Sequence, residues 1–244
     1  MLQLLKGRYR ARVAADASDL ARAQTLRGLC FGIASGRDAD AFDPVCTHML
    51  IEDQASGMLV CCFRLLPVHD APTLKHCYSA QHYDLSALAG YPGPMLELGR
   101  FCLHPDWHDP DILRIAWGAL TRQVDAMGIG LLFGCTSFAG VDAVRHLDAF
   151  SLLYQAHRAP EPWRPLRKAA QVFEFADGLR DHSIDRSRAK ATMPPLLRTY
   201  LLMGGWVSDH AVIDREMQTM HVFTAVEIAL IPATRVRLLR AVAS

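Results

Sequence analysis

The sequence predicts a mixed α/β fold in which helices pack against one sheet. Short apolar runs of strand length alternate with longer stretches whose apolar residues recur every three or four positions. One pair of short runs is separated by a five-residue turn segment, and two more β-like runs come near the end of the chain. A chain of 244 residues is also long enough to bury one large core. Together these features are typical of helices layered on a sheet.

The first predicted elements are a strand and a helix. Residues 8–13 alternate arginine with other side chains, which predicts a strand with one apolar face and one arginine face. A helix is expected to open at Ser18 or Asp19 and to end near Gly32, because its apolar residues have helical spacing. A polar loop over residues 37–44 follows.

A hairpin and a third strand come next. Residues 48–52 and 58–66 are apolar runs on either side of a polar segment, which predicts a β-hairpin. Residues 68–94 are rich in Pro, Gly and His, and we expect them to be irregular. Residues 95–103 form the third apolar run.

A capped helix should follow the third strand. Asp109 is a suitable N-cap and Pro110 a suitable first helical residue, and Gly128 would end the helix. Residues 129–138 then have the composition of a strand, and a helix is expected over residues 141–154.

The last third of the chain is expected to elaborate the same domain. We interpret residues 155–190 as an insertion, because they are rich in proline and basic residues. A helix is predicted from Pro194 to about Met203, followed by β-like runs near 207–214 and 221–231. The sequence thus predicts one domain over residues 1–244.

Composition excludes several classes of protein. Hydrophobic residues make up 51% of the chain, charged residues 21%, and the net charge is +1, which argues against disorder and against nucleic acid as a partner. Seven cysteines without a Cys-x-x-Cys pair argue against a disulfide framework or a metal site. No apolar run approaches the ~18 residues of a membrane span. We therefore expect a cytoplasmic protein, a setting compatible with attachment to the inner face of the membrane.

The run Met95–Leu103 carries the most informative residues. Glu97 lies within an apolar strand, where a buried carboxylate is costly unless it is paired. Strict alternation would place Glu97 and Arg100 on opposite faces. Gly99 between them suits a β-bulge, which would turn both toward one face and free a backbone N–H for an oxyanion. A structural Glu–Arg pair between neighbouring strands explains the pattern equally well.

Two arginines flank this run in the predicted fold. Arg27 and Phe31 share one helix face and could cover a substrate cleft, although a surface arginine over a core aromatic is the commoner arrangement. Arg64 lies in an apolar strand, where arginine usually has a fixed carboxylate partner. Asp43 and Glu97 are the candidates for that partner.

The polar loop supplies two further carboxylates, Asp40 and Asp43. They could hold an amine substrate or act as a general base. By themselves they are more typical of solvated turn residues.

The start of the helix at Pro110 bears on whether the chain could bind a diphosphate-containing ligand such as CoA. No glycine-rich loop precedes it, and Asp109 and Asp111 would repel the diphosphate of CoA. An acyl group carried by a protein, which presents one phosphate, fits better. Basic residues in the predicted insertion suit an acidic carrier protein or anionic lipid head groups, although a solvated insertion explains them as well: Arg158, Arg164, Arg167, Lys168, Arg186, Arg188 and Lys190.

Several stretches together resemble known families. Four motifs resemble those of acyl-homoserine lactone synthases: Arg27…Phe31, Asp40…Asp43, Arg64-Leu-Leu-Pro67 and Glu97…Arg100-Phe101. Five are still more similar to the ornithine–acyl-carrier-protein N-acyltransferases of ornithine lipid synthesis, a haemolysin-like group of the GNAT superfamily: Lys6–Tyr9, Asp40–His48, Glu97–Arg100, Gly134–Phe138 and Pro194–Leu201. The likeness spans nearly the whole chain.

The resemblance implies a GNAT-like α/β (α+β) fold, with a central mixed sheet flanked by helices, an insertion and a C-terminal helix–strand extension. It implies transfer of a 3-hydroxyacyl group from acyl carrier protein to the α-amine of an amino acid, ornithine first, with no cofactor. Lyso-ornithine lipid would be the product. Two groups of site residues are implied: catalytic Glu97, Asp43 and Arg100, with Glu97 the first candidate base, and substrate-binding Arg27, Phe31, Asp40, Arg64 and Phe101.

Three alternatives stay open. The family pattern Phe-Asn-Thr-x-Asp-Val is replaced here by Met217–Val222, so glutamine or another amino acid is an alternative acceptor. An acyl-homoserine lactone synthase would instead use S-adenosylmethionine, and the insertion and the stretch Pro194–Leu201 weigh against it. A non-enzymatic protein that binds acyl chains or membranes at the periphery would use a basic amphipathic helix, for which residues 233–242 are a candidate.

Overall fold

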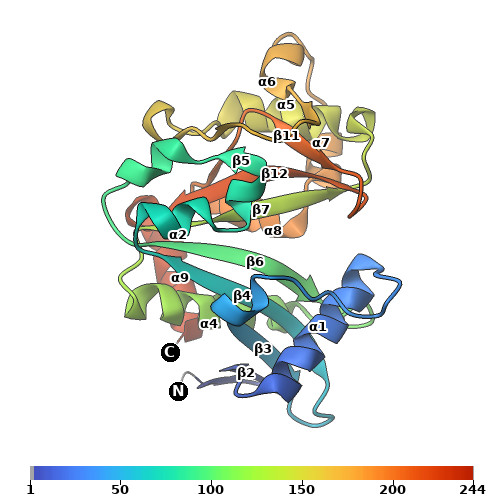
Figure 1. Cartoon of the computed structure of the whole chain (residues 1–244), viewed down its shortest axis with the longest axis vertical. Helices are drawn as coiled ribbons and strands as arrows, with labels where there is room; N and C mark the ends of the chain where they lie inside the picture. Colours follow the sequence, from blue (N-terminus) through green and yellow to red (C-terminus); the bar gives the residue numbers. More distant parts are fainter. Residues whose placement is uncertain (1–2, 244) are drawn as a thin grey trace. The chain divides into compact units, whose positions relative to one another are not determined.

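The computed structural model describes residues 3–243, which divide into two compact units. Unit 1 is formed by Met1–Pro67, Leu96–Ile129 and Pro232–Ser244, and unit 2 by Val68–Met95 and Gly130–Ile231. Each unit combines a sheet with helices (Figure 1), which confirms the predicted mixed α/β class.

Unit 1 contains strands in the order β1-β2-β3-β4-β6, of which β1 to β4 are successive antiparallel neighbours. Their bounds are β1 (Gln3–Lys6), β2 (Tyr9–Val13), β3 (Thr47–Asp53), β4 (Leu59–Val68) and β6 (Met95–Leu103). Its helices are α1 (Ala17–Phe31), α4 (Pro110–Ala126) and α9 (Ala233–Ala243). The predicted hairpin is confirmed as β3–β4, although β4 continues one residue past Pro67.

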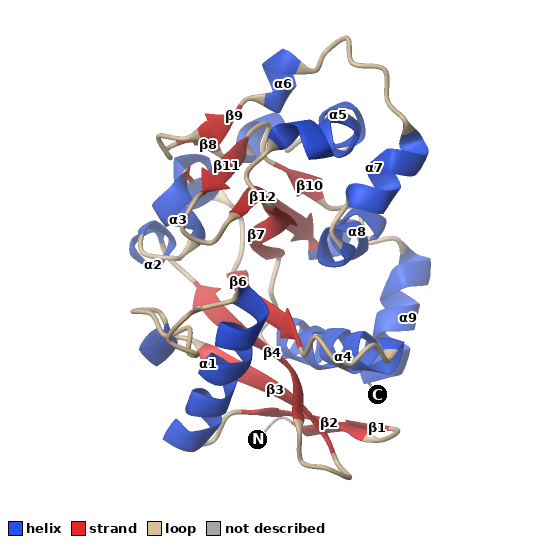
Figure 2. Ribbon diagram, turned by 90° about the vertical axis from the view of Figure 1, so that its right-hand side faces the viewer, coloured by secondary structure: helices blue, strands red, loops and turns tan. Residues whose placement is uncertain are grey.

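Helices α1 and α4 cover opposite faces of these strands (Figure 2). The alternation of β3 explains the arrangement, because successive side chains of a strand point to opposite faces. Leu50 packs in a cluster with Ala23 and Leu26 of α1, whereas the sulfur of its neighbour Met49 accepts a hydrogen bond from Gln123 of α4. Both faces of the sheet in unit 1 are therefore buried.

The predicted arginine face of β2 is confirmed. Tyr9 and Ala11 are buried, while the arginines between them turn to the other side. Arg10 and Arg12 of β2 contact carboxylates on β3 and α1. Together with Arg22 of α1 they form what we call the Glu52 cluster: Arg10, Arg12, Asp19, Arg22 and Glu52. Three guanidinium groups donate to Glu52 at 2.6–2.8 Å, and Arg12 also pairs with Asp19.

Helix α1 begins earlier than predicted. Its N-cap is Asp16, whose side chain accepts a hydrogen bond from the backbone of Asp19. The predicted caps Ser18 and Asp19 are both wrong; Asp19 pairs with Arg12 instead, so a contact with the sheet overrides its capping role. The helix ends as predicted at Gly32, whose φ of +65° is the left-handed conformation that glycine adopts without strain.

Helix α4 has the predicted cap. The Asp109 carboxylate accepts from the backbone N–H of Asp111 and, at 2.8 Å, from the Tyr9 hydroxyl. Helix α9 packs closely against α4 at Gly118, which has no side chain. An added Cβ at this position would lie 2.9 Å from Cγ1 of Val242, which is too close for a normal contact. The candidate amphipathic helix therefore uses part of its surface inside unit 1.

Unit 2 is built around a long antiparallel pair, β7 (Leu131–Ala139) and β12 (Thr219–Glu227). The strand order continues from β12 to β11 (Ala211–Asp214) and β9 (Val172–Phe173). The remaining pairs are formed by β10 (Trp206–Val207) with β12, and by β5 (Tyr83–Asp84) with β8 (Leu166–Arg167). Its helices are α2 (Ala71–Lys75), α3 (Ser79–His82), α5 (Leu147–Ala156), α6 (Phe175–Gly178), α7 (Arg186–Thr192) and α8 (Pro195–Leu202).

Most predicted elements of unit 2 are confirmed, with four differences. The run predicted near 207–214 is divided into the short strands β10 and β11. The segment 68–94 contains the short helices α2 and α3 in place of irregular chain. The helix predicted over 141–154 begins as a 3₁₀ turn and continues as α5. Within the predicted insertion, β9 pairs with β11, so this segment extends the sheet edge. Among residues 3–243, no helix is long and apolar enough to cross a bilayer.

Candidate active site

Three arginines and three aspartates of unit 1 form one closed ring of alternating charge. Helix α1 supplies one arginine, β4 and β6 supply one each, and the loop after α1 supplies the aspartates. Each aspartate contacts two arginines, and each arginine contacts two aspartates. We call this set the charge ring; in order around it lie Arg27, Asp38, Arg100, Asp40, Arg64 and Asp43.

Arg27 is the most buried member of the charge ring. Only 1% of it is exposed, so the expected surface position over a core aromatic is wrong. Its Nε donates to Asp38 at 2.7 Å, and its Nη1 and Nη2 donate to the two oxygens of Asp43 at 2.8 and 3.0 Å. This forked contact holds guanidinium and carboxylate in one plane.

Arg64 and Arg100 close the ring from the sheet. Arg64 Nη1 donates to Asp40 at 2.5 Å and to Asp43 at 3.0 Å, which confirms Asp43 as a partner predicted for this arginine. Arg100 donates through Nε to Asp38 at 2.9 Å and through Nη2 to Asp40 at 3.1 Å. The structure thus brings together five residues that the sequence singled out.

The loop reaches the ring because glycine allows a close approach. An added Cβ on Gly28 would lie 2.5 Å from the carbonyl oxygen of Gly36, so the loop can fold back on α1 only without a side chain there. The backbone N–H of Asp38 then donates to the carbonyl of Gln24 at 3.0 Å. A 3₁₀ turn that begins at Asp43 directs its carboxylate inward.

Two of the loop carboxylates, Asp40 and Asp43, have lowered pKa values and are therefore weak bases. Burial by itself would raise the pKa of Asp43, but hydrogen bonds from Arg27 and Gln24 hold that pKa well below its usual range. Burial opposes ionisation of Asp40 too, and the contact with Arg64 leaves its pKa lowered. Neither aspartate is therefore a solvated turn residue, and both are weak proton acceptors near neutral pH.

Aromatic side chains border the ring on one side. The guanidinium of Arg100 lies 5.6 Å from the centre of Phe31, and that of Arg64 lies 5.3 Å from the centre of Phe42, both within cation–π range. Phe101 is placed differently. It stacks on Phe63 at 5.3 Å and lies over Trp117 of α4 at 6.5 Å, on the far face of the sheet from α1.

Glu97 is a buried carboxylate on the same strand as Arg100. It is 5% exposed. Its charge reaches Cys46, the residue after the 3₁₀ turn: burial raises the pKa of that thiol to about 11, Arg64 opposes the rise, and Glu97 adds to it together with Asp40 and Asp43. Glu97 therefore shares the electrostatic neighbourhood of the charge ring.

The strand departs from regular geometry beside Glu97. Arg100 has a φ of +52°, in the left-handed region that side chains rarely adopt. The predicted irregularity at Gly99 thus falls one residue later. Gly99 lies against the side chain of Arg64, where an added Cβ would be in ordinary van der Waals contact with Arg64 Nε at 3.4 Å. Strain of this kind persists where surrounding contacts impose it, and here the contacts to Asp38 and Asp40 do so.

Sequence reasoning missed one member of the ring. Asp38 is buried and joins Arg27 to Arg100, yet it appeared only as part of a polar loop. A signal for it existed, because buried arginines need carboxylate partners and Asp38 lies in the same loop as Asp40 and Asp43. Gln24 and His48 were missed as well. The Gln24 side chain donates a hydrogen bond to the Asp43 carboxylate, and His48 Nε2 is hydrogen-bonded to the Asp43 backbone carbonyl.

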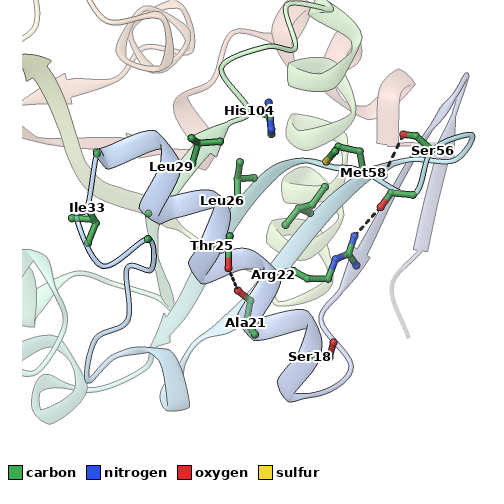
Figure 3. Close-up of a pocket in the computed structure, with 15 residues that line it drawn as sticks. Ser18, Ala21, Arg22, Thr25, Leu26, Leu29, Ile33, Ser56, Met58 and His104 are labelled. Atoms are coloured by element: carbon green, nitrogen blue, oxygen red, sulfur yellow. Dashed lines mark hydrogen bonds between the residues drawn. The ribbon is translucent and has the colours of Figure 1, made fainter.

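A separate open pocket of about 850 Å³ runs along the outer side of α1 (Figure 3). Leu26, Leu29 and Ile33 give it an apolar wall, and Arg22 closes one end by donating to the carbonyl of Gly57 at 2.9 Å. Its lining includes no member of the charge ring. Over residues 3–243, no group of three His, Cys, Asp or Glu side chains is arranged to hold a metal ion.

Comparison with known proteins shows which family the chain belongs to. A family model described as an acetyltransferase (GNAT) domain matches residues 29–118. The L-ornithine Nα-acyltransferase of Rhodobacter capsulatus is 33% identical over 230 residues, which is 88% of this chain and 88% of the relative. The chain belongs to the family of L-ornithine Nα-acyltransferases. A second relative of that name, from Brucella abortus, is 32% identical over 77% of this chain and 69% of its own length.

A solved structure supports the fold of this family member. TofI, in its apo form, is 16% identical, with 96% of this chain and 98% of TofI covered at a TM-score of 0.53. The predicted GNAT-like fold is confirmed by this likeness and by the family model. As a member of the L-ornithine Nα-acyltransferase family the protein is an acyltransferase, which sets aside the non-enzymatic alternative.

Proposed function

We propose that this acyltransferase moves a 3-hydroxyacyl group from acyl carrier protein to the α-amine of ornithine, giving lyso-ornithine lipid. The observation that carries the proposal is the likeness to L-ornithine Nα-acyltransferases over 88% of both chains. The charge ring beside a buried carboxylate, Glu97, supplies the chemistry that such a transfer needs.

The reaction begins with loss of a proton from the α-ammonium, because only the free amine attacks a thioester. Glu97 is the base in this proposal, directly or through a water molecule. The amine nitrogen then bonds to the thioester carbonyl carbon, the carbon–sulfur bond breaks, and the carrier's thiol leaves with a proton. Asp43 is the weaker candidate base, since its contacts with Arg27 and Gln24 keep its pKa low.

The exposed edge of the charge ring suits a zwitterionic acceptor. Four members are buried, whereas the side chains of Asp40 and Arg100 keep 21% and 13% of their surface exposed. A free amino acid carries a carboxylate and an ammonium on one carbon. In our proposal Arg100 takes the carboxylate and Asp40 takes the ammonium, while the buried members hold both in place.

The start of α4 supports a carrier protein as donor over CoA. Helix N-termini bind phosphates through free backbone N–H groups. Here the Asp109 carboxylate occupies the N–H of Asp111, and Asp111 adds a second negative charge. Unit 2 also carries a depression of about 380 Å³ whose lining has four arginines and three carboxylates, Glu174, Asp177 and Asp209. The excess of arginine favours an acidic carrier: Arg158, Arg164, Arg167 and Arg180.

The proposal is tested with purified protein and two donors, 3-hydroxyacyl carrier protein and the matching acyl-CoA. Ornithine, glutamine and S-adenosylmethionine are offered separately, and products are identified by mass spectrometry. We expect an N-acylated ornithine from the carrier-protein donor. Acyl-homoserine lactone from S-adenosylmethionine, or turnover only with acyl-CoA, would refute the proposal.

A further inference from the structure

Helix α9 of unit 1 has one buried side and one exposed side. The buried side packs against α4, where Val242 lies beside Gly118 (Figure 2). The exposed residues lie three or four positions apart, which places them together on the other side of the helix: Thr234, Arg237, Leu238 and Ala241. The helix is therefore amphipathic, and its packing inside unit 1 uses only one of its two sides.

The surroundings of the exposed side are strongly basic. Residues 228–243 contain three arginines and no aspartate or glutamate. Lys6 of β1 adds a fourth positive charge at the end of the helix, because its Nζ donates to the backbone carbonyl of Ala241 at 3.4 Å. We call these residues, with the exposed leucine, the α9 surface: Lys6, Arg235, Arg237, Leu238 and Arg240.

Little negative charge balances the α9 surface. Among residues 3–243 its four cations form one ion pair, between Arg240 and Asp125 of α4 at 3.3 Å. Arg237 is exposed and meets no carboxylate of the described residues at ion-pair distance. The surface therefore keeps a net positive charge that an anionic partner can neutralise.

An exposed leucine lies beside Arg237 on this surface. Leu238 keeps 59% of its area exposed. Arginine stems and leucine side chains together suit the boundary between lipid head groups and acyl chains, where the charge stays at the phosphates and the apolar atoms leave water. Charge and apolar area on the same side of one helix are typical of attachment to a bilayer surface.

A second basic helix of the chain lacks this combination. Helix α7 of unit 2 carries Arg186, Arg188 and Lys190, all exposed. Residues 186–192 include no large apolar side chain that is exposed. Positive charge without apolar area is typical of a solvated helix. Helix α7 is therefore a matched control for α9.

We propose that unit 1 docks on bilayers of anionic lipid through the α9 surface, with its cations at the lipid phosphates and Leu238 toward the acyl chains. Charge complementarity selects this partner, because four cations with one paired carboxylate attract a negatively charged surface. In the proposed function the product carries one long acyl chain. Docking would then bring the enzyme to the membrane that takes up this product.

The first test uses the unaltered protein and lipid vesicles. Co-sedimentation is compared for vesicles of phosphatidylcholine alone and for vesicles that also contain phosphatidylglycerol. We expect binding to the anionic vesicles only, and loss of that binding in about 1 M salt, where the Debye length is about 3 Å. Equal binding to both kinds of vesicle, or binding to neither, would overturn the proposal.

The second test uses three single substitutions. Arg237→Gln should weaken binding to anionic vesicles about fivefold, because it removes one unpaired charge near the lipid phosphates. Leu238→Ser should weaken binding as well, without changing its dependence on salt, since it removes apolar area and no charge. Arg186→Gln on α7 is the control and should leave binding unchanged. An equal loss in Arg186→Gln and Arg237→Gln would show that total charge, and not the α9 surface, carries the binding.

A second copy of the chain is the other occupant to test. Light scattering measures the mass of the unaltered protein and of Arg237→Gln without lipid. We expect the same mass for both. A dimer that dissociates in Arg237→Gln, together with a lack of vesicle binding, would assign the surface to self-association and refute the membrane partner.

The outcomes separate docking from catalysis, because none of the substituted residues belongs to the charge ring. All three variants should acylate dissolved ornithine as the unaltered enzyme does, which also checks that they fold. If ornithine is acylated and no vesicle is bound, docking is refuted and the proposed function stands. If anionic vesicles are bound through α9 and no amino acid is acylated, docking stands and the proposed function fails.

Discussion

Unit 1 holds carboxylates among arginines in two places, and the two differ in burial and connectivity. In the Glu52 cluster three arginines converge on one carboxylate, and they keep between 21% and 41% of their side-chain surface exposed. In the charge ring every charge contacts two opposite charges, and Arg27 is almost fully buried. The first arrangement ties β2, β3 and α1 together. The second holds Asp40 and Arg100 at a partly exposed edge, where we propose that they bind the substrate, so the two places differ in what the same pairing chemistry is available for.

The largest expected effect is on activity, and it distinguishes Glu97, in the electrostatic neighbourhood of the charge ring, from Glu52. Glu97→Gln should lower kcat by ~10²–10⁴-fold, because it removes the proposed base while keeping the shape of the side chain. Glu52→Gln should leave kcat within about twofold of the unaltered enzyme. Steady-state kinetics with acyl carrier protein and ornithine measure both, and circular dichroism checks that both variants fold. Full activity in Glu97→Gln would remove Glu97 from the mechanism.

The next effect concerns stability. Arg27→Ala should lower the free energy of unfolding by about 3–5 kcal/mol, because it leaves Asp38 and Asp43 buried without their main counter-charge. Urea denaturation followed by tryptophan fluorescence measures the change. Arg27→Lys is the matched control: it keeps the charge without the fork and should recover only part of the loss. A change below about 1 kcal/mol in Arg27→Ala would show that the ring does not stabilise the fold.

A smaller effect appears in acid. Burial would raise the pKa of Glu52, yet its arginine partners lower it from 4.5 to about 2. A carboxylate with a lowered folded-state pKa adds stability above its unfolded pKa and loses it as pH falls through the folded value. The stability difference between the unaltered protein and Glu52→Gln should therefore be full above pH ~4.5 and vanish toward pH ~2. Chemical denaturation at several pH values measures it, and a difference independent of pH would contradict this account.

The smallest effect is expected at the rim of the Glu52 cluster. Arg10 is 41% exposed and is one of three partners of Glu52, so Arg10→Ala should cost no more than about 1 kcal/mol. Thermal unfolding in low and high salt measures it, and salt should shrink the difference. A loss as large as that of Arg27→Ala would erase the distinction between the two regions.

Local patterns predicted the arginine face of β2 better than the charge ring. The arginine face of β2 follows from alternation within six residues, which is visible in any window of the sequence. The charge ring joins residues up to 62 positions apart, such as Asp38 and Arg100. Spacing alone pointed to a surface Arg27 and a solvated Asp43, and the structure shows both side chains buried. Phe101 was grouped with the ring by that resemblance, whereas the structure places it over α4.

Predictions of helix ends and strand irregularities were wrong where a contact with a distant residue replaced a local one. Asp19 has the sequence context of an N-cap, but Arg12 binds it and Asp16 takes that role. The departure from strand geometry was placed at Gly99 on propensity, yet Arg100 carries it because Asp38 and Asp40 hold its guanidinium. Helix and strand propensities describe single residue types, whereas both of these outcomes depend on contacts between residues of different elements.

The order of the charge ring along the chain also bears on how family members can be recombined. One stretch of residues 24–43 carries Gln24, Arg27 and all three aspartates, while Arg64 and Arg100 come from separate strands. A chimera that exchanges this helix and loop as one cassette would transplant the whole acidic half together with the glycines that let it fold back. A crossover between residues 28 and 36 would separate Gly28 from Gly36, so the helix of one parent would meet the loop of the other at this close approach.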